Sequence, residues 1–219
     1  MAVEAIDGDF LPIAMASCEG DVAVRRYKIG DGHNYEWVHI PTLRDGMASI
    51  LRHTKSVQIH RTVRDRAKWE LECLLVLIGL TGTDYSRGIP LIKPKKLWHI
   101  LPKILPILAN ECFHGGNASP QLVPEVAAEA VYSAIYANIF ASHIKSSGDF
   151  HAVMASMQAS KLAARTKQSL PSFERAECTI KNVNFILAYW TGARPESMDP
   201  QYGFREVQGQ VKFEDEAAF

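Results

Sequence analysis

The chain has 219 residues, of which 47% are hydrophobic and 22% charged, and its 24 basic residues balance 24 acidic ones. This composition is typical of a globular protein and excludes a disordered tail, a collagen and a coiled coil. The longest strongly apolar run, residues 71–80, has about half of the length that a bilayer core requires, and the N-terminus lacks the order of a signal peptide. We therefore expect a soluble intracellular protein of the nucleus or cytoplasm, without a membrane partner.

The first part of the chain is predicted to combine strands and helices. Alternating apolar residues predict strands at residues 2–6, 22–29 and 35–40, with a glycine-containing turn at 30–34, and helices are predicted at 41–53 and 63–80. The second helix is almost wholly apolar over its later turns, so we expect those turns to be buried.

From residue 94 onward the pattern is helical. We predict a proline-interrupted helix from Pro94, then helices at residues 124–145, 150–166 and 172–190, and a mostly irregular acidic tail after Gly192. The expected fold class is therefore α/β, with an α/β first part at residues 1–110 and a mostly helical C-terminal half at 111–219.

The common zinc-protease, serine-hydrolase and P-loop motifs do not occur, and the four cysteines form no CxxC pair. The first candidate site is instead a pair of carboxylates, Asp7 and Asp9, which bracket a glycine where the first strand ends. Two such carboxylates can face one crevice, and Mg²⁺ prefers a few carboxylates completed by waters and substrate phosphates. The sequence DGD is also common in turns, so a purely structural turn is the alternative.

The second candidate site lies in a basic part of the chain. Residues 51–110 carry 11 basic and 4 acidic residues, a net charge of +7, and residues 85–110 contain no carboxylate at all. A stretch of one sign is typical of a solvated face, and also of a surface that binds a phosphate backbone and releases its counterions. Charge alone leaves both interpretations open.

Residues 82–96, GTDYSRGIPLIKPKK, connect two of the predicted helices within this basic segment. The buried helix would deliver Asp84 at its end, a glycine-containing hairpin would follow, and a lysine-bearing helix would begin at Pro94. Backbone N–H groups and lysines in this arrangement favour an anion. The alternative is a surface corner between two helices with solubilising lysines.

This segment resembles the helix-two-turn-helix of the flap-endonuclease superfamily, the structure-specific 5′ nucleases with a PIN-like fold. In that family G-[CST]-D-Y precedes a G-I-x-G-I-G-P-K hairpin, and the upstream IDGDFL is similar to the family strand that ends in D-x-D. The resemblance covers residues 3–105, with the helix-two-turn-helix at 81–105. It implies a partial PIN-like sheet before the hairpin, and the tail vaguely resembles viral or mobile-element relatives.

The resemblance implies a metal-dependent nuclease of DNA repair or replication that acts on branched or 5′-flap DNA. Mg²⁺ or Mn²⁺ would be held, and hydrolysis catalysed, at Asp7, Asp9 and Asp84. The residues implied in binding duplex phosphates without reading sequence are Arg87, Gly88, Lys93, Lys95 and Lys96. The resemblance also implies K⁺ as a second ion, held by carbonyl groups of the hairpin.

The sequence departs from the family pattern in two places. Leu91 and Lys93 stand where the hairpin of the family has glycine, which allows close approach to phosphate. The family also places an aspartate-bearing strand, a basic arch and a glutamate-rich segment before the D-x-D strand, where this chain begins. We therefore expect a part of a nuclease, completed by an upstream segment or a partner chain.

Two further hypotheses stay open. The chain could be a DNA-binding or interaction module that keeps the hairpin but is catalytically inactive. It could also be a helical scaffold whose basic segment faces an acidic partner.

Overall fold

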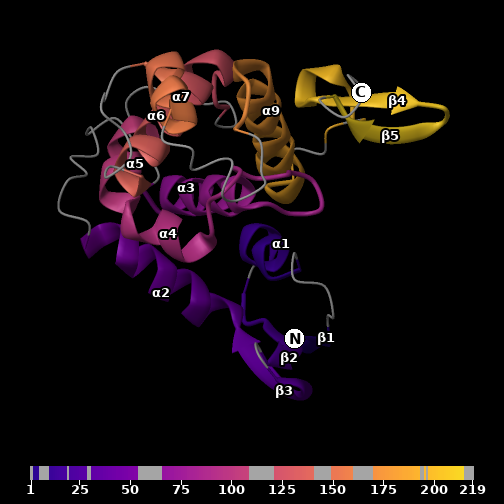
Figure 1. Ribbon diagram of the computed structural model, residues 1–219. Helices are drawn as coiled ribbons and strands as arrows, with labels where there is room; N and C mark the ends of the chain where they lie inside the picture. The colour runs from indigo at the N-terminus through magenta and orange to yellow at the C-terminus, as the bar shows by residue number, and fades with distance from the viewer. Residues whose placement is uncertain are drawn as a thin grey trace.

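The computed structural model describes residues 2–4, 10–18, 20–28, 31–53, 66–108, 121–140, 149–159, 170–192, 195 and 197–214 of the chain. Three strands and three helices form the first part of this structure (Figure 1): β1 (Ala2–Glu4), α1 (Phe10–Ser17), β2 (Ala23–Lys28), β3 (Asp31–His39), α2 (Ile40–His53) and α3 (Arg66–Thr81). The remaining elements are α4 (Pro94–His99), α5 (Leu101–Ile107), α6 (Pro124–Ile139), α7 (Phe150–Ala159), α9 (Phe173–Trp190), the 3-10 turn η2 (Pro200–Tyr202), β4 (Phe204–Val207) and β5 (Gln210–Phe213).

The three N-terminal strands form one small mixed sheet in the order β1-β2-β3. β2 is parallel to β1 and antiparallel to β3, with Val24 opposite Val38 in the register. The predicted strands at 22–29 and 35–40 are confirmed. The prediction of a turn at residues 30–34 was wrong over residues 31–34, because β3 already begins at Asp31. The described strands do not form a parallel, PIN-like sheet.

The buried helix α3 lies at the centre of the molecule, packed against α1, α2, α4 and α9. Its residues 72–77 and 79–80 are buried, which confirms the prediction from their apolar character. Gly79 faces α9 closely, since a Cβ atom at this position would lie 3.0 Å from Cγ2 of Val183. The small residue therefore allows the two helices to approach each other.

Prolines divide the helical segment that follows the α3–α4 connection. The chain forms two short helices, α4 and α5, separated at Ile100 and not one long helix. Pro102 lies in the first turn of α5, where the lack of an N–H group costs little, and Pro106 lies near its end. The predicted interruption by proline is confirmed.

The C-terminal half consists mainly of α6, α7 and α9, which the described residues confirm at 124–139, 150–159 and 173–190. The predicted extensions to residues 145 and 166 lie outside the described residues. Asn184 of α9 joins this half together, because its buried amide bonds both the N–H and the C=O of Leu122, at 2.9 and 2.8 Å. Buried side chains of both predicted parts, among them Leu77 and Ile186, belong to one hydrophobic cluster. The division at residue 110 stays a prediction.

The helix α1, the 3-10 turn η2 and the ribbon of β4 and β5 were not predicted. Residues 10–17 form the helix α1, and the tail forms the antiparallel ribbon β4–β5 where a mostly irregular segment was expected. The ribbon projects beside α9, far from the three-stranded sheet (Figure 1). The fold is thus mixed α/β and mostly helical. No described helix is both long and apolar enough to cross a membrane.

Candidate nucleic-acid interface

The connection between α3 and α4 forms a hydrogen-bonded hairpin. The N–H of Ile89 donates to the C=O of Leu80 at 2.8 Å, which returns the chain to the end of α3. Within the hairpin, Thr83 and Ser86 form a small antiparallel bridge, with N–H to O distances of 2.7 and 3.3 Å. Gly88 completes the turn by donating its N–H to the Ser86 hydroxyl at 3.3 Å. The hairpin is therefore an ordered unit of the fold.

Three residues of the hairpin have positive φ values: Gly82 at φ +98°, Gly88 at φ +67° and Leu91 also at φ +67°. At Gly88 a side chain is excluded by space, because a Cβ atom would lie 2.5 Å from the backbone nitrogen of Gly82. Leu91 tells more about the type of hairpin than Gly88 does, since leucine rarely adopts this conformation. It is the position at which the resembled hairpin has glycine.

The helical half holds this hairpin in place from α6. The buried hydroxyl of Tyr136 donates a hydrogen bond of 2.8 Å to the C=O of Pro90. Burial is the main reason that the pKa of Tyr136 lies well above its usual value, with the neighbouring Tyr132 adding to the effect. The phenol therefore stays protonated and remains a donor to the hairpin.

A second contact holds the beginning of the hairpin against α9. The ring of Tyr85 lies 5.7 Å from that of Phe185 and 5.8 Å from that of Tyr189, measured between centroids. Phe185 and Tyr189 are themselves stacked at 5.5 Å. The residue next to Asp84 is thus fixed by an aromatic cluster on α9.

Asp84 follows the end of α3 and has an exposed side chain. Asp7 and Asp9, the other two predicted carboxylates, lie outside the described residues. The helix that follows them in sequence, α1, begins at Phe10 and packs against both α3 and α9. Within the described residues, no group of three His, Cys, Asp or Glu side chains is close enough together to hold a metal ion.

The cations predicted to bind phosphates differ in whether they already contact an aromatic ring of the protein. Lys93 and Lys95 are exposed, and the ammonium group of neither residue has a hydrogen-bond or ion-pair partner in the described part of the chain. Lys96 instead places its ammonium group 4.9 Å from the ring of Phe140, at the end of α6. Arg87 lies 5.2 Å over the ring of Phe213 in β5. Lys93 and Lys95 are therefore the cations most accessible to an external anion.

The backbone N–H groups of the hairpin also differ in whether they already have an acceptor. The N–H groups of Thr83, Ser86 and Ile89 are used inside the hairpin or by α3, as described above. The N–H groups of Leu91 and Lys93 have no acceptor among the described residues. The unused donors and the exposed ammonium groups thus belong to the same short segment, residues 91–95.

Sequence reasoning missed the residues that support the hairpin. In the sequence, Tyr136 lies 46 residues from Pro90. Phe185 lies 100 residues from Tyr85, and Phe213 lies 126 residues from Arg87. Their pattern in the sequence is that of ordinary core residues, so no signal could have assigned them to the hairpin. Comparisons with protein-family models, with curated proteins and with solved structures give no match to this chain.

Proposed function

We propose that this chain is a structure-specific 5′ nuclease of the flap-endonuclease kind, or part of one, that acts on branched or 5′-flap DNA. It holds the phosphates of a DNA duplex at the α3–α4 hairpin. It hydrolyses a phosphodiester bond with divalent metal ions at Asp7, Asp9 and Asp84. The resembled PIN-like fold and the roles of Arg87, Gly88 and the hairpin lysines belong to the same proposal.

The observation that carries the proposal is the left-handed conformation of Leu91. The resemblance in sequence places a glycine-type position there, and glycine is the residue that favours φ > 0. Leu91 has φ +67°, although this left-handed conformation is energetically unfavourable for leucine. The backbone therefore supports a hairpin of the resembled type in spite of the substitution.

Charge and hydrogen-bond donors support the same surface. Lys93 and Lys95 are exposed on the same short segment as the unused N–H groups of Leu91 and Lys93. Contacts of this kind bind phosphates without reading the sequence. Each neutralised phosphate contributes to a salt-dependent affinity.

The donor chemistry of the three aspartates fits Mg²⁺ or Mn²⁺, which prefer oxygen ligands over nitrogen or sulfur. Asp84 offers an exposed carboxylate next to the hairpin, and Asp7 and Asp9 would complete the set. When bound, such ions activate a water and stabilise the leaving oxygen. A K⁺ ion at the hairpin would use carbonyl groups other than that of Pro90, which already accepts from Tyr136.

The test is cleavage of a labelled 5′-flap duplex by the chain, alone and joined to any segment encoded upstream of it. We expect Mg²⁺-dependent cleavage that EDTA abolishes and that Asp84→Asn lowers by about 100-fold or more. Lys93→Ala with Lys95→Ala should weaken binding of the duplex without abolishing hydrolysis at saturating protein. Cleavage that is indifferent to Asp84→Asn would contradict the catalytic part of the proposal.

A second candidate function is a DNA-binding module without catalysis. It is favoured by the contacts of Tyr136 with Pro90 and of Tyr85 with Phe185, which hold the hairpin from the helical half. The hairpin can therefore bind a duplex whether or not the carboxylates are catalytic. Salt-sensitive binding that depends on Lys93 and Lys95, without cleavage in any metal, would favour this candidate. If the chain binds no DNA duplex at low salt, both the nuclease and the DNA-binding module are excluded, and a scaffold protein is favoured.

A further inference from the structure

The β4–β5 ribbon is a well-defined element of the C-terminal tail. Its two-residue turn has both central residues, Gln208 and Gly209, in the left-handed conformation, at φ +55° and +74°. This is the turn geometry that matches the twist of a hairpin. The base of the ribbon closes through a bond of 2.9 Å from the N–H of Glu214 to the C=O of Gly203.

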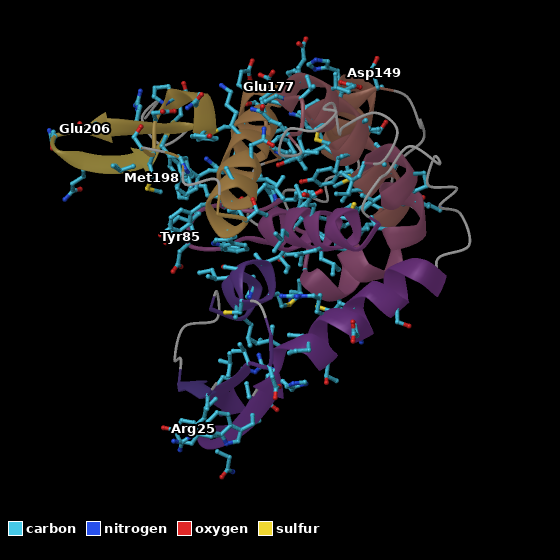
Figure 2. The ribbon with its side chains drawn as sticks, turned by 180° about the vertical axis from the view of Figure 1, so that it is seen from behind. Arg25, Tyr85, Asp149, Glu177, Met198 and Glu206 are labelled. Carbon is cyan, nitrogen blue, oxygen red and sulfur yellow. The ribbon has the colours of Figure 1, made fainter. Side chains whose placement is uncertain are left out.

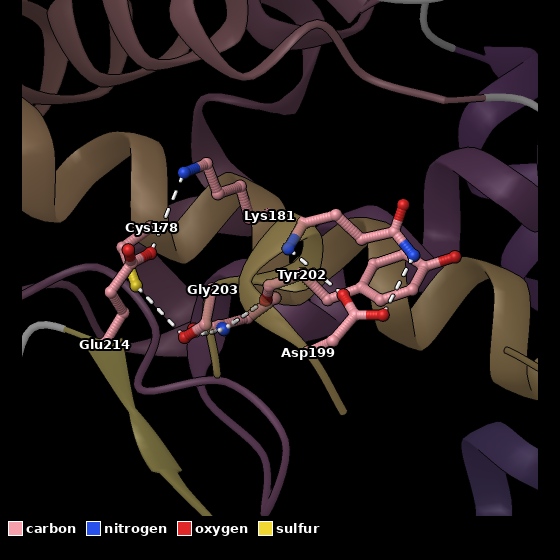
Figure 3. A network of polar contacts seen from close by, with 8 residues as sticks. Cys178, Lys181, Asp199, Tyr202, Gly203 and Glu214 are labelled. Atoms are coloured by element: carbon pink, nitrogen blue, oxygen red, sulfur yellow. Dashed lines mark hydrogen bonds and ion pairs between the residues drawn. The ribbon is translucent and has the colours of Figure 1, made fainter. Parts of the chain in front are cut away.

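Polar contacts fix the base of the ribbon to α9 (Figure 3). The amide of Asn182 donates to the C=O groups of Tyr202 and Gly203, at 2.8 and 3.3 Å, and the thiol of Cys178 also donates to Gly203. Lys181 pairs with Glu214 at 3.7 Å. These contacts therefore hold the base of the ribbon in place against α9.

The register gives the ribbon two different faces. Phe204 lies opposite Phe213 on one face, which packs against the aromatic cluster of α9 through Phe185. On the other face, Arg205 lies directly opposite Lys212. Two cations thus occupy one cross-strand pair.

This pair is unfavourable in the protein alone. Like charges at directly opposed positions of two strands destabilise the pair. The Nε atom of Arg205 is also buried and has no hydrogen-bond partner in the described part of the structure. A buried donor without an acceptor is costly.

The acidic residues of the described ribbon do not compensate this pair. Glu214 is paired with Lys181, and Glu206 projects from the face opposite to that of Arg205 and Lys212. An anion placed between Arg205 and Lys212 would remove the repulsion between the two cations. The pair thus has the chemistry of a phosphate site.

We propose that Arg205 and Lys212 form a second contact with the phosphate backbone of the nucleic acid, an inference that rests on the proposed function. Charge complementarity and the contact of the ribbon with the hairpin argue for this occupant. Arg87 of the hairpin lies over Phe213, the residue next to Lys212, on the other face of the ribbon. Tyr85 of the hairpin and Glu206 of the ribbon lie on the same side of the molecule (Figure 2). The ribbon therefore adds a second basic surface close to the hairpin.

The salt dependence of duplex binding tests this surface. The affinity of the full chain for a labelled 5′-flap duplex is measured by fluorescence anisotropy between about 50 and 200 mM salt. Lys212→Gln should lower the slope of log K against log salt by about one, and Lys212→Gln with Arg205→Gln by about two. The matched control is Arg25→Gln, which removes the same charge at the far end of the molecule and should leave the slope unchanged (Figure 2).

Thermal unfolding without DNA separates a phosphate contact from a structural role. Lys212→Gln removes the repulsion, so it should raise Tm while it weakens binding. Lys212→Glu places a carboxylate opposite Arg205 and should raise Tm further, with a larger loss of affinity. Because Lys212 is exposed, neither variant removes core packing. A fall in Tm for Lys212→Gln would overturn the inference.

The outcomes distinguish the ribbon from the hairpin. If Lys93→Ala with Lys95→Ala lowers the slope and Lys212→Gln does not, the ribbon inference is wrong and the proposed function stands. If the unaltered chain binds no duplex at low salt, both are wrong. If inorganic phosphate raises Tm through Lys212 while the slope for DNA is unchanged, the site binds a free anion and the assignment to nucleic acid is wrong.

Discussion

The hydroxyl of Tyr136, on α6, donates a hydrogen bond of 2.8 Å to the C=O of Pro90, in the α3–α4 hairpin. Tyr136 is fully buried, and Pro90 lies between Gly88 and Leu91, which both have left-handed backbone conformations. One bond therefore connects the helical half of the chain with the segment that carries the candidate phosphate contacts. The hairpin depends on residues of both halves for its shape.

Replacing Tyr136 by phenylalanine tests the strength of this connection. The ring and its packing stay, but the C=O of Pro90 loses its donor. We expect the free energy of unfolding to fall by about 1 kcal/mol, as measured by denaturant unfolding. Tyr189→Phe is the matched control, because Tyr189 is exposed and should tolerate the loss of its hydroxyl. Equal stability of the two variants would contradict the role of the bond.

The same residue predicts a dependence on alkaline pH. Burial raises the pKa of Tyr136 in the folded protein, whereas tyrosines of the unfolded chain ionise near pH 10. Above about pH 10 the native state therefore binds more protons than the unfolded state, and stability falls as pH rises, by up to about 1.4 kcal/mol per pH unit. The contribution is fully present below that pH. Tyr136→Phe should lose less stability than the unaltered protein between about pH 9 and 11, and parallel curves would contradict this assignment.

Gly88 and Gly209 both have positive φ values, but a side chain is disfavoured at the two positions for different reasons. A Cβ atom at Gly88 would lie 2.5 Å from the nitrogen of Gly82 and 2.7 Å from the carbonyl carbon of Thr81, whereas Gly209 has open space around it. Gly209→Ala should cost about 1 kcal/mol, from backbone conformation alone. Gly88→Ala should cost about 3 kcal/mol, because backbone atoms must also move. Thermal unfolding of both variants measures the difference, and similar costs would show that the hairpin can relax.

The sequence allowed the position of the hairpin to be predicted from local signals. The apolar run predicted a helix to residue 80, which ends at Thr81, and Pro94 predicted the first residue of α4. These signals are local because apolar character and the lack of a proline N–H act within a few residues. The partners that hold the hairpin could not be predicted, because Tyr136 and Phe185 meet it only after the chain has folded.

The ribbon and α1 were missed for different reasons. The turn of the ribbon uses Gln208 before Gly209, and glutamine is not a usual residue at a left-handed turn position, so the common Asn-Gly signal was missing. In α1, eight residues rich in apolar side chains, with Pro12 near the start, show no distinct polar face. Short apolar runs do not distinguish helix from loop or strand. Asp7 and Asp9, which precede α1, lie outside the described residues and their role stays a proposal.

The lysines of the hairpin should differ in their effect on stability. The ammonium group of Lys96 lies over Phe140, at the end of α6, where the helix dipole favours a cation. Lys96→Ala should lower the free energy of unfolding by about 0.5 kcal/mol, whereas Lys95→Ala should leave it almost unchanged. In duplex binding, Lys95→Ala should lower the salt slope by about one. The two variants are compared by denaturant unfolding and by anisotropy, and a larger loss of stability for Lys95→Ala would contradict the division.

Leu91 provides the most direct test of the hairpin itself. Its φ of +67° strains any residue with a Cβ, while its side chain is only partly buried. Leu91→Ala loses packing and keeps the strain, whereas Leu91→Gly loses packing and removes the strain. We therefore expect the glycine variant to be more stable than the alanine variant by about 1 kcal/mol, the reverse of the usual order. Glycine also lets the backbone approach phosphate more closely, so Leu91→Gly should bind the 5′-flap duplex at least as tightly as the unaltered chain. Denaturant unfolding and anisotropy measure the two effects, and a glycine variant that is less stable than the alanine variant would contradict the left-handed conformation of Leu91.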